Sequence, residues 1–261
     1  MTLPALFVSH GSPMIALQQT PASRFLAGLA AELPRPRAIL VVSAHWETAT
    51  PMLNAVERNE TIHDFFGFPR PLYDLRYPAP GDAALAGDIA ARLGKAGFAA
   101  GTDPSRGLDH GAWIPLLLAW PDASIPTLQL SVQSRLGPRH AFAIGQALAP
   151  LREEGVLMLG SGSFTHDLRR FRGQAIDAPE SDDVTAFSDW MDAAIGHGDT
   201  EALLAYRSRA PHAADEHPTE EHLLPLFTAL GAGGAGAVRR LHRSTEYSIL
   251  RMDAYAFGLP A

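Results

Sequence analysis

The chain has 261 residues, of which 46% are hydrophobic, and a formal net charge of -7. This length and hydrophobic fraction are enough to bury a large core, and we expect a single domain over residues 1–261. The 21 Lys and Arg residues are scattered, which argues against a nucleic-acid partner and favours a small molecule. The chain has no cysteine. This excludes disulfides, thiolate nucleophiles and iron–sulfur clusters, and leaves only nitrogen and oxygen ligands for a metal.

The sequence also argues against membrane and nucleotide binding. The first residues do not form a basic segment followed by an apolar stretch and a cleavage site, and the apolar runs are too short to cross a bilayer. We therefore expect a cytoplasmic protein with no membrane partner. No glycine-rich phosphate-binding motif follows a strand-like segment, so no nucleotide cofactor is expected.

Short apolar runs alternate with amphipathic segments along the first 160 residues. The runs are rich in Val, Leu and Ile, which is typical of strands covered on both faces. The predicted strands are residues 5–9, 38–43, 127–131 and 156–160. The segments between them place apolar residues at helical spacing. The predicted helices are residues 22–32, 82–97, 113–119 and 139–152.

The last third of the chain is less regular. Residues 183–195 and 200–208 read as helices, and residues 220–230 begin with an acidic turn that suits a helix N-terminus. The Gly/Ala-rich residues 231–237 suggest a flexible connection, and the rough alternation over 244–257 predicts one long strand that returns to the sheet.

This order of elements predicts an α/β fold: a single domain with a central, mostly parallel or mixed sheet flanked by helices. Right-handed crossovers bring the C-terminal ends of parallel strands to one edge of such a sheet, where ligands bind. The segment from residue 47 to 80 has little periodicity and many Pro, Phe and Tyr residues. Long loops of this kind within compact domains are often functional.

Four histidines stand where the predicted elements end or begin. His10, His45 and His166 each follow an apolar run, and His222 lies where a helix is expected to start. Together they suggest a first-row metal site. Taken singly, a histidine at a strand end is more often a structural residue. By pattern alone, His222 fits a solvated helix surface better.

A fifth histidine, His110, lies between Asp109 and Gly111 and close to Trp113. This set suits an acid/base residue that lines an aromatic pocket, although a turn before a helix would look the same. His63 and Asp64 could likewise bind substrate. The remaining histidines have no converging partner and are expected to be structural or exposed. They are His140, His197, His212, His217 and His242.

Several motifs, in order along the chain, resemble those of one family. They are Pro4-Ala-Leu-Phe-Val-Ser-His-Gly-Ser-Pro-Met14, Ser43-Ala-His-Trp46, Thr61-Ile-His-Asp-Phe65, Leu108-Asp-His-Gly-Ala-Trp113, Thr165-His-Asp-Leu168 and Pro218-Thr-Glu-Glu-His-Leu-Leu-Pro225. Together they resemble the 4,5-DOPA extradiol dioxygenases, which belong to the class III ring-cleaving dioxygenases. The resemblance covers nearly the whole chain, with little of it in residues 171–215.

The resemblance implies a single catalytic domain of the class III catalytic-subunit type with one mononuclear non-haem metal, which is Fe(II) in active enzymes and often Zn(II) in purified preparations. His10, His45 and His222 would be metal ligands. His166 would be either a fourth ligand or the acid/base. His110 would be a catalytic residue that hydrogen-bonds substrate or dioxygen. The implied substrates are a DOPA-like or other small catechol and O2, with both oxygen atoms inserted; oligomeric state is not predicted.

Some alternatives remain open at this point. The wider class uses two histidines and a glutamate, so Glu220 or Glu221 could supply a carboxylate ligand beside His222. A zinc hydrolase could use the same histidines to activate water, and a non-catalytic metal-binding relative could keep the fold. Aromatic side chains that could pack on a substrate ring are Trp46, Phe65, Phe68 and Trp113.

Overall fold

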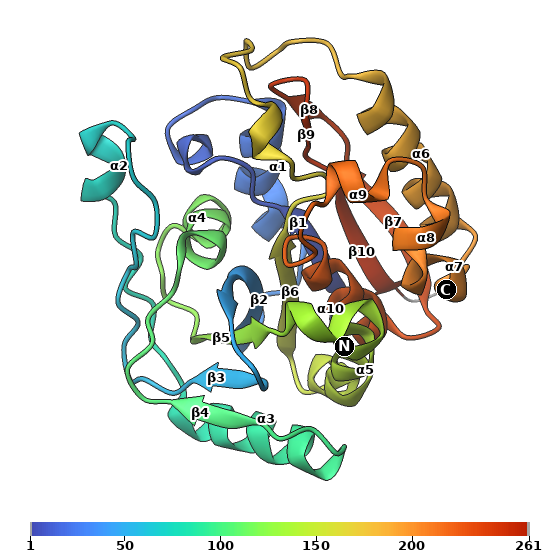
Figure 1. The fold of residues 1–261 in the computed structure, drawn as a ribbon. Coiled ribbons are helices and arrows are strands. Elements are labelled where there is room, and N and C mark those ends of the chain that lie inside the picture. The colour runs from blue at the N-terminus through green and yellow to red at the C-terminus, as the bar shows by residue number, and fades with distance from the viewer. Residues whose placement is uncertain (1, 260–261) are drawn as a thin grey trace.

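Four apolar segments form the parallel centre of an eight-stranded sheet in the computed structural model, which describes residues 2–259 (Figure 1). In spatial order they are β5 (Thr127–Val132), β2 (Ala38–Glu47), β6 (Val156–Gly162) and β1 (Ala5–Ser9). Their pairings are all parallel. Both faces of these strands are buried, which explains why the sequence shows continuous apolar runs rather than alternation.

Shorter strands extend the sheet on both sides and make it mixed. Beyond β5, β3 (Met52–Asn54) pairs antiparallel and β4 (Gly101–Asp103) pairs parallel to β3. Beyond β1, β10 (Ala254–Leu259) and the edge strand β7 (Ala237–His242) pair antiparallel. The predicted α/β fold with a mixed sheet flanked by helices is thus confirmed.

Helices cover both faces of the sheet, and alternate residues of each central strand point to opposite cores. In β1, Ala5 and Phe7 contribute to one core while Leu6 and Val8 contribute to the other. The first core is covered by α3 (Ala83–Lys95), α5 (Gly137–Leu148), α6 (Asp182–Gly196) and α10 (Leu224–Gly233). The second is covered by α1 (Pro21–Gly28) and α4 (His110–Ala119).

The remaining α-helices and strands within residues 2–259 are short. They are α2 (Arg70–Asp74), α7 (Thr200–Leu204), α8 (Tyr206–Arg209), α9 (Ala213–Glu216), β8 (Thr245–Glu246) and β9 (Leu250–Arg251). Within residues 2–259, no helix combines the length and hydropathy that a membrane span requires.

The prediction of one long strand over 244–257 was wrong. The chain instead forms the hairpin β8–β9 and only then enters the sheet as β10. The hairpin turns at Tyr247 and Ser248, whose φ angles are 56° and 68°. The turn lacks the Gly or Asn that normally marks such a conformation, so no local pattern predicts it.

Helix boundaries also differ from the predictions. The helix expected over 220–230 begins at Leu224, after a turn that contains His222, and continues to Gly233, into the stretch expected to be a connection. The helix expected over 113–119 begins earlier, at His110, because the Asp109 carboxylate accepts a hydrogen bond from the backbone N–H of Ala112 at 3.2 Å and caps it.

Candidate functional site

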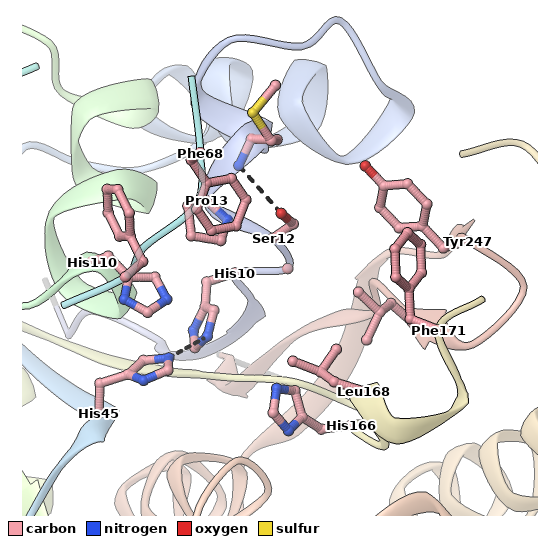
Figure 2. A pocket seen from close by; sticks show the side chains of 14 residues that line it. His10, Ser12, Pro13, His45, Phe68, His110, His166, Leu168, Phe171 and Tyr247 are labelled. Atoms are coloured by element: carbon pink, nitrogen blue, oxygen red, sulfur yellow. Dashed lines mark hydrogen bonds between the residues drawn. The ribbon is translucent and has the colours of Figure 1, made fainter. Parts of the chain in front are cut away.

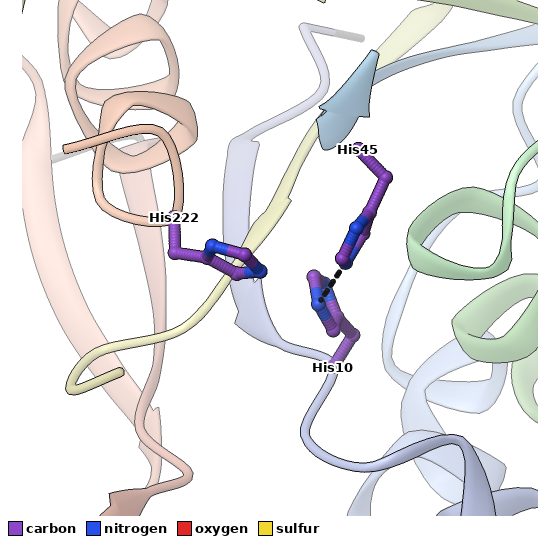
Figure 3. A group of neighbouring side chains, drawn as sticks. All are labelled: His10, His45 and His222. Atoms are coloured by element: carbon purple, nitrogen blue, oxygen red, sulfur yellow. Dashed lines mark hydrogen bonds between the residues drawn. The ribbon is translucent and has the colours of Figure 1, made fainter. Parts of the chain in front are cut away.

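Three histidines from distant parts of the chain converge at the C-terminal edge of the parallel strands (Figure 3). His10 directly follows β1, His45 lies within β2, and His222 lies in the turn before α10. The Nε2 atoms of His10 and His45 are 3.0 Å apart. One ring nitrogen from each of the three histidines lies within 4.8 Å of the others. This arrangement can hold a metal ion with nitrogen ligands.

An irregularity in the sheet places His45. The register of β2 against β5 shifts between Val42 and Glu47, so the residues between them leave the regular ladder. Such irregularities re-aim side chains. The position of His45 after an apolar run had suggested that it lies beyond the end of the strand. In the structure, His45 lies inside β2.

A hydrogen-bond chain orients His10. Its Nδ1 lies 3.1 Å from the hydroxyl of Ser161, which in turn donates to the backbone carbonyl of Gly111. Because the Ser161 hydrogen is used in this way, Nδ1–H of His10 donates to Ser161 Oγ. The lone pair of His10 Nε2 then faces the cluster, as a metal ligand requires.

A carboxylate orients His222 in the same way. Nδ1 of His222 donates to Glu221 Oε1 at 2.9 Å. Nε2 of His222 is buried and has no hydrogen-bond partner among residues 2–259. An unpaired buried nitrogen is costly, and a cation held between His222, His10 and His45 would satisfy it. The donor set therefore fits a metal.

Burial keeps these imidazoles neutral. It lowers the pKa of His10 and His222 well below the usual value, and neighbouring histidines lower both further. Burial and then repulsion from His110 lower the pKa of His45 to about 3. Neutral imidazole is the form that binds metal, so no proton has to leave at neutral pH.

His110 has its own carboxylate partner, which is Asp64. Nδ1 and the backbone N–H of His110 donate to the same oxygen of Asp64, at 3.0 and 2.9 Å. Burial acts to raise the pKa of Asp64, but its hydrogen bonds with His110 outweigh that effect and lower the pKa to about 2. Asp64 is therefore ionised, and Nε2 of His110 is left free. The sequence neighbour Asp109 instead caps α4 and accepts from Ser43 Oγ at 2.6 Å.

His166 lies against His222 rather than between His10 and His45. The two rings stack with centroids 3.4 Å apart, and His166, Glu221 and His222 form a second group of possible ligand atoms. Burial lowers the pKa of His166 to about 4. Glu220 is directed elsewhere, because it accepts a hydrogen bond from the Tyr206 hydroxyl at 2.9 Å.

A cavity of about 490 Å³ opens beside the histidines (Figure 2). His10, His45, His110 and His166 line one end of it. The other lining residues are Gly11, Ser12, Pro13, Met14, Phe65, Phe68, Leu168, Phe171, Tyr247 and Leu250. Such a concave apolar space with a few convergent polar groups is typical of a small-molecule site.

Two of the four aromatic residues expected to pack on a substrate ring line this cavity, Phe65 and Phe68. Trp113 is buried in the core, where its indole N–H donates to the Ile62 carbonyl at 2.9 Å. The guanidinium of Arg106 lies over the ring of Trp46, 5.2 Å from its centroid.

The histidines outside the cavity have other partners. His63 binds the Leu75 carbonyl through Nε2 at 3.1 Å, and Nε2 of the buried His217 lies 3.0 Å from the Phe164 carbonyl. No sequence pattern predicted Ser161 as a partner of His10, or the wall made by Phe171 and Tyr247. The adjacency of Glu221 and His222 was visible, but the orienting hydrogen bond was not.

Comparisons with known proteins identify the family of this chain. Residues 4–258 match the family model described as the catalytic LigB subunit of aromatic ring-opening dioxygenase. A 4,5-DOPA dioxygenase extradiol from Beta vulgaris is 44% identical, over 96% of this chain and 95% of the relative. A 4,5-DOPA dioxygenase extradiol from Escherichia coli (strain K12) is 40% identical, over 88% of this chain and 85% of the relative. The crystal structure of an uncharacterized protein from Escherichia coli K12 matches with a TM-score of 0.82 and 34% identity, covering 98% of this chain and 100% of that one.

These matches span nearly the whole chain, and the histidine cluster fits the metal site that ring opening by dioxygen requires. The chain belongs to the LigB family of aromatic ring-opening dioxygenases and is an extradiol ring-cleavage oxidoreductase.

Proposed function

We propose that His10, His45 and His222 bind one non-haem metal ion, Fe(II) in the active enzyme, in a single catalytic domain that spans the chain. The observation that carries this proposal is the orientation of His10 and His222, whose Nδ1 atoms are hydrogen-bonded and whose Nε2 atoms face the cluster. Zn(II) suits the same nitrogen ligands and is expected to compete during purification.

The substrates would be O2 and a small catechol, since relatives such as those from Beta vulgaris and Escherichia coli carry the name 4,5-DOPA dioxygenase extradiol. When bound, Fe(II) supplies a redox-active centre that couples an electron-rich ring to dioxygen, which Zn(II) cannot do. The ring opens between a hydroxylated carbon and its unhydroxylated neighbour. Both atoms of O2 enter the product, a hydroxymuconic semialdehyde.

His110 would remove a proton from a catechol hydroxyl. Its Nε2 is free, and the ionised Asp64 on Nδ1 stabilises the imidazolium that forms. The edge-to-face contact of Phe65 with His110, at 5.6 Å between centroids, places an aromatic face beside this base. Phe65 and Phe68 would hold the substrate ring and exclude water.

His166 is the second candidate for the base, or a further ligand. His166→Ala separates these roles by metal analysis and kinetics on one sample. Loss of metal would assign a ligand role. Retained metal with a strongly reduced turnover rate would assign the acid/base role.

The function is tested by anaerobic reconstitution of metal-free protein with Fe(II) or Zn(II), followed by a catechol and air. We expect a yellow ring-opened product and oxygen uptake with Fe(II) alone. Ester or amide hydrolysis with Zn(II) and no oxygen uptake would instead support the hydrolase alternative. Tight metal binding without turnover would support a non-catalytic relative.

A further inference from the structure

Asp109 is a fully buried carboxylate that does not line the cavity. Its Oδ1 accepts hydrogen bonds from the Ser43 hydroxyl at 2.6 Å and from the backbone N–H of Ala112 at 3.2 Å. Its Oδ2 accepts from the Arg106 guanidinium at 3.2 Å and from the side-chain amide of Gln129. Capping α4 needs only the bond from Ala112, so the other three hydrogen bonds go beyond helix capping.

Ser43 connects this carboxylate to the backbone of His45. The buried Ser43 hydroxyl donates to Asp109 and accepts from the His45 N–H at 3.2 Å. The pairings of β2 with β6 end at Ser43, and those with β5 shift register after Val42. His45 therefore lies where the regular ladder no longer fixes the strand, and the Asp109–Ser43 pair holds its backbone there.

Arg106 makes a second connection to the same segment. The Arg106 Nη2 atom that donates to Asp109 also lies 3.5 Å from the His45 carbonyl oxygen. Its guanidinium covers the ring of Trp46, the next residue, at 5.2 Å from the centroid. The N–H and the C=O of His45 thus both face groups that are hydrogen-bonded to Asp109.

The same carboxylate fixes the first turn of α4, which begins with His110. This turn lies tightly against β2. A Cβ at Gly111 would lie 2.5 Å from Ser43 Oγ and 2.9 Å from the His45 ring. Asp109 therefore stands at the junction between the strand that carries His45 and the helix that carries His110.

We propose that Asp109 is a positioning residue that locks the irregular segment of β2 carrying His45 onto the helix turn carrying His110. This inference rests on the proposed function, in which His45 binds the metal and His110 accepts a proton. Because one buried group holds both segments, the separation of metal ligand and base is set before a substrate binds. Misplacement of reacting groups by about 1 Å can lower a rate on the order of 100-fold.

Asp109→Ala tests the inference by metal binding as well as by rate. We expect the Kd for Zn(II), measured by competition with a chelator, to rise by about 10- to 100-fold. The visible spectrum of the Co(II)-loaded variant should change, because it depends on the coordination geometry. With saturating Fe(II), kcat for catechol should fall by about 10- to 100-fold. Asp82→Ala is the matched control, because Asp82 caps α3 by the same kind of bond, from Leu85 N–H at 2.9 Å, and should leave all three readouts unchanged.

Ser43→Ala tests the path from Asp109 to His45, because it removes the hydroxyl between them and leaves the cap of α4 in place. Zn(II) binding should weaken in this variant. The Asp109→Ala/Ser43→Ala double variant should bind Zn(II) no more weakly than Asp109→Ala alone, since both changes break one path. Ser188→Ala is the control, because Ser188 is also buried and its hydroxyl has no hydrogen-bond partner among residues 2–259.

The outcomes separate this inference from the function on which it rests. A wild-type Kd for Zn(II) and an unchanged Co(II) spectrum in Asp109→Ala would overturn the inference, even if the thermal midpoint falls. Additive losses of binding free energy in the double variant would overturn it too. If Asp109→Ala does not fold, Ser43→Ala decides alone, and a wild-type Kd there overturns the inference. Failure of the Fe(II)-loaded wild type to cleave any catechol would instead refute the proposed function, whereas the Zn(II) and Co(II) readouts do not depend on turnover.

Discussion

At the scale of single residues, the site depends on which nitrogen of each imidazole carries the proton. His10 and His222 are held by Ser161 and Glu221 through Nδ1. His110 is held by Asp64 in the same way. Partners of this kind, which orient ligands without touching the metal, commonly change affinity or activity by 10- to 100-fold when removed.

His45→Ala should remove metal and activity together. The variant leaves two of the three converging nitrogens, while the backbone of β2 keeps its pairings. Metal content by elemental analysis should fall to a small fraction of that of the wild type, with an unchanged circular dichroism spectrum. His197→Ala, at an exposed position, is the control. Stoichiometric iron in His45→Ala would contradict the assigned ligand set.

Asp64→Asn should separate catalysis from metal binding. Loss of the ionised carboxylate removes the charge that stabilises a protonated His110, so kcat should fall by about 10- to 100-fold with metal content unchanged. Asp74→Asn is a suitable control, because Asp74 is exposed at the end of the short helix α2. A wild-type rate in Asp64→Asn would exclude His110 as the base.

His217 gives a prediction for stability against pH. Burial lowers the pKa of His217 to about 4, so the unfolded chain takes up its proton near pH 6.5 while the folded protein does not. The wild type therefore loses stability at this site as pH falls from about 7 to 4. Measured by urea unfolding, the free energy of unfolding of His217→Gln should rise relative to that of the wild type by up to about 3 kcal/mol as pH falls over that range. A pH-independent difference would contradict a buried neutral imidazole.

At the scale of elements, the site depends on how closely the segment around His222 approaches β6. A Cβ at Gly162 would lie 2.0 Å from the His222 carbonyl oxygen, which accepts a hydrogen bond from the backbone N–H of Ser163 at 2.8 Å. Gly111 has a similar role on the other side, since its Cβ would lie 2.9 Å from the His45 ring. Glycine is needed at both positions to bring the ligands together.

Gly162→Ala should therefore displace His222. We expect a loss of about 1–3 kcal/mol in the free energy of unfolding from overpacking, together with weaker metal binding measured by competition with a chelator. Gly87→Ala on α3 is the control, because a Cβ there meets nothing within 4 Å and should be neutral or stabilising. Unchanged metal affinity in Gly162→Ala would show that the segment around His222 can move without weakening metal binding.

The elements also show how far local sequence predicts structure. The four central strands were predicted because their apolar runs fit strands buried on both faces. The short strands β3, β4 and β7 were not, because their residues show neither a long apolar run nor clear alternation. The β8–β9 hairpin was missed because tertiary contacts, rather than Gly or Asn, support the left-handed turn at Tyr247.

At the scale of the whole molecule, a bound metal would join three segments that are far apart in sequence. His10, His45 and His222 enter the site from β1, β2 and the turn before α10. A metal that binds the folded chain and not the unfolded one stabilises it by mass action. The site is thus expected to couple metal occupancy to global stability.

Addition of Zn(II) to metal-free protein should raise the thermal midpoint. At a free Zn(II) concentration 100 times the Kd, the free energy of unfolding should rise by about 2.7 kcal/mol. This corresponds to a rise of roughly 5–10 °C in the thermal midpoint for a chain of this length. Differential scanning calorimetry with and without Zn(II) measures the shift. The same titration of His45→Ala should give little or none, and an equal shift in that variant would place the stabilising metal elsewhere.

The sequence by itself determined the α/β class, the histidine inventory and the nitrogen and oxygen character of any metal site. These follow from local apolar runs, from motif order and from the absence of cysteine. Only the tertiary structure decided the partners, such as Asp64 rather than Asp109 for His110, and Ser161 for His10. It alone brought Phe171 and Tyr247 together as a cavity wall. These contacts join residues tens to hundreds of positions apart, and local propensity carries no information about such distances.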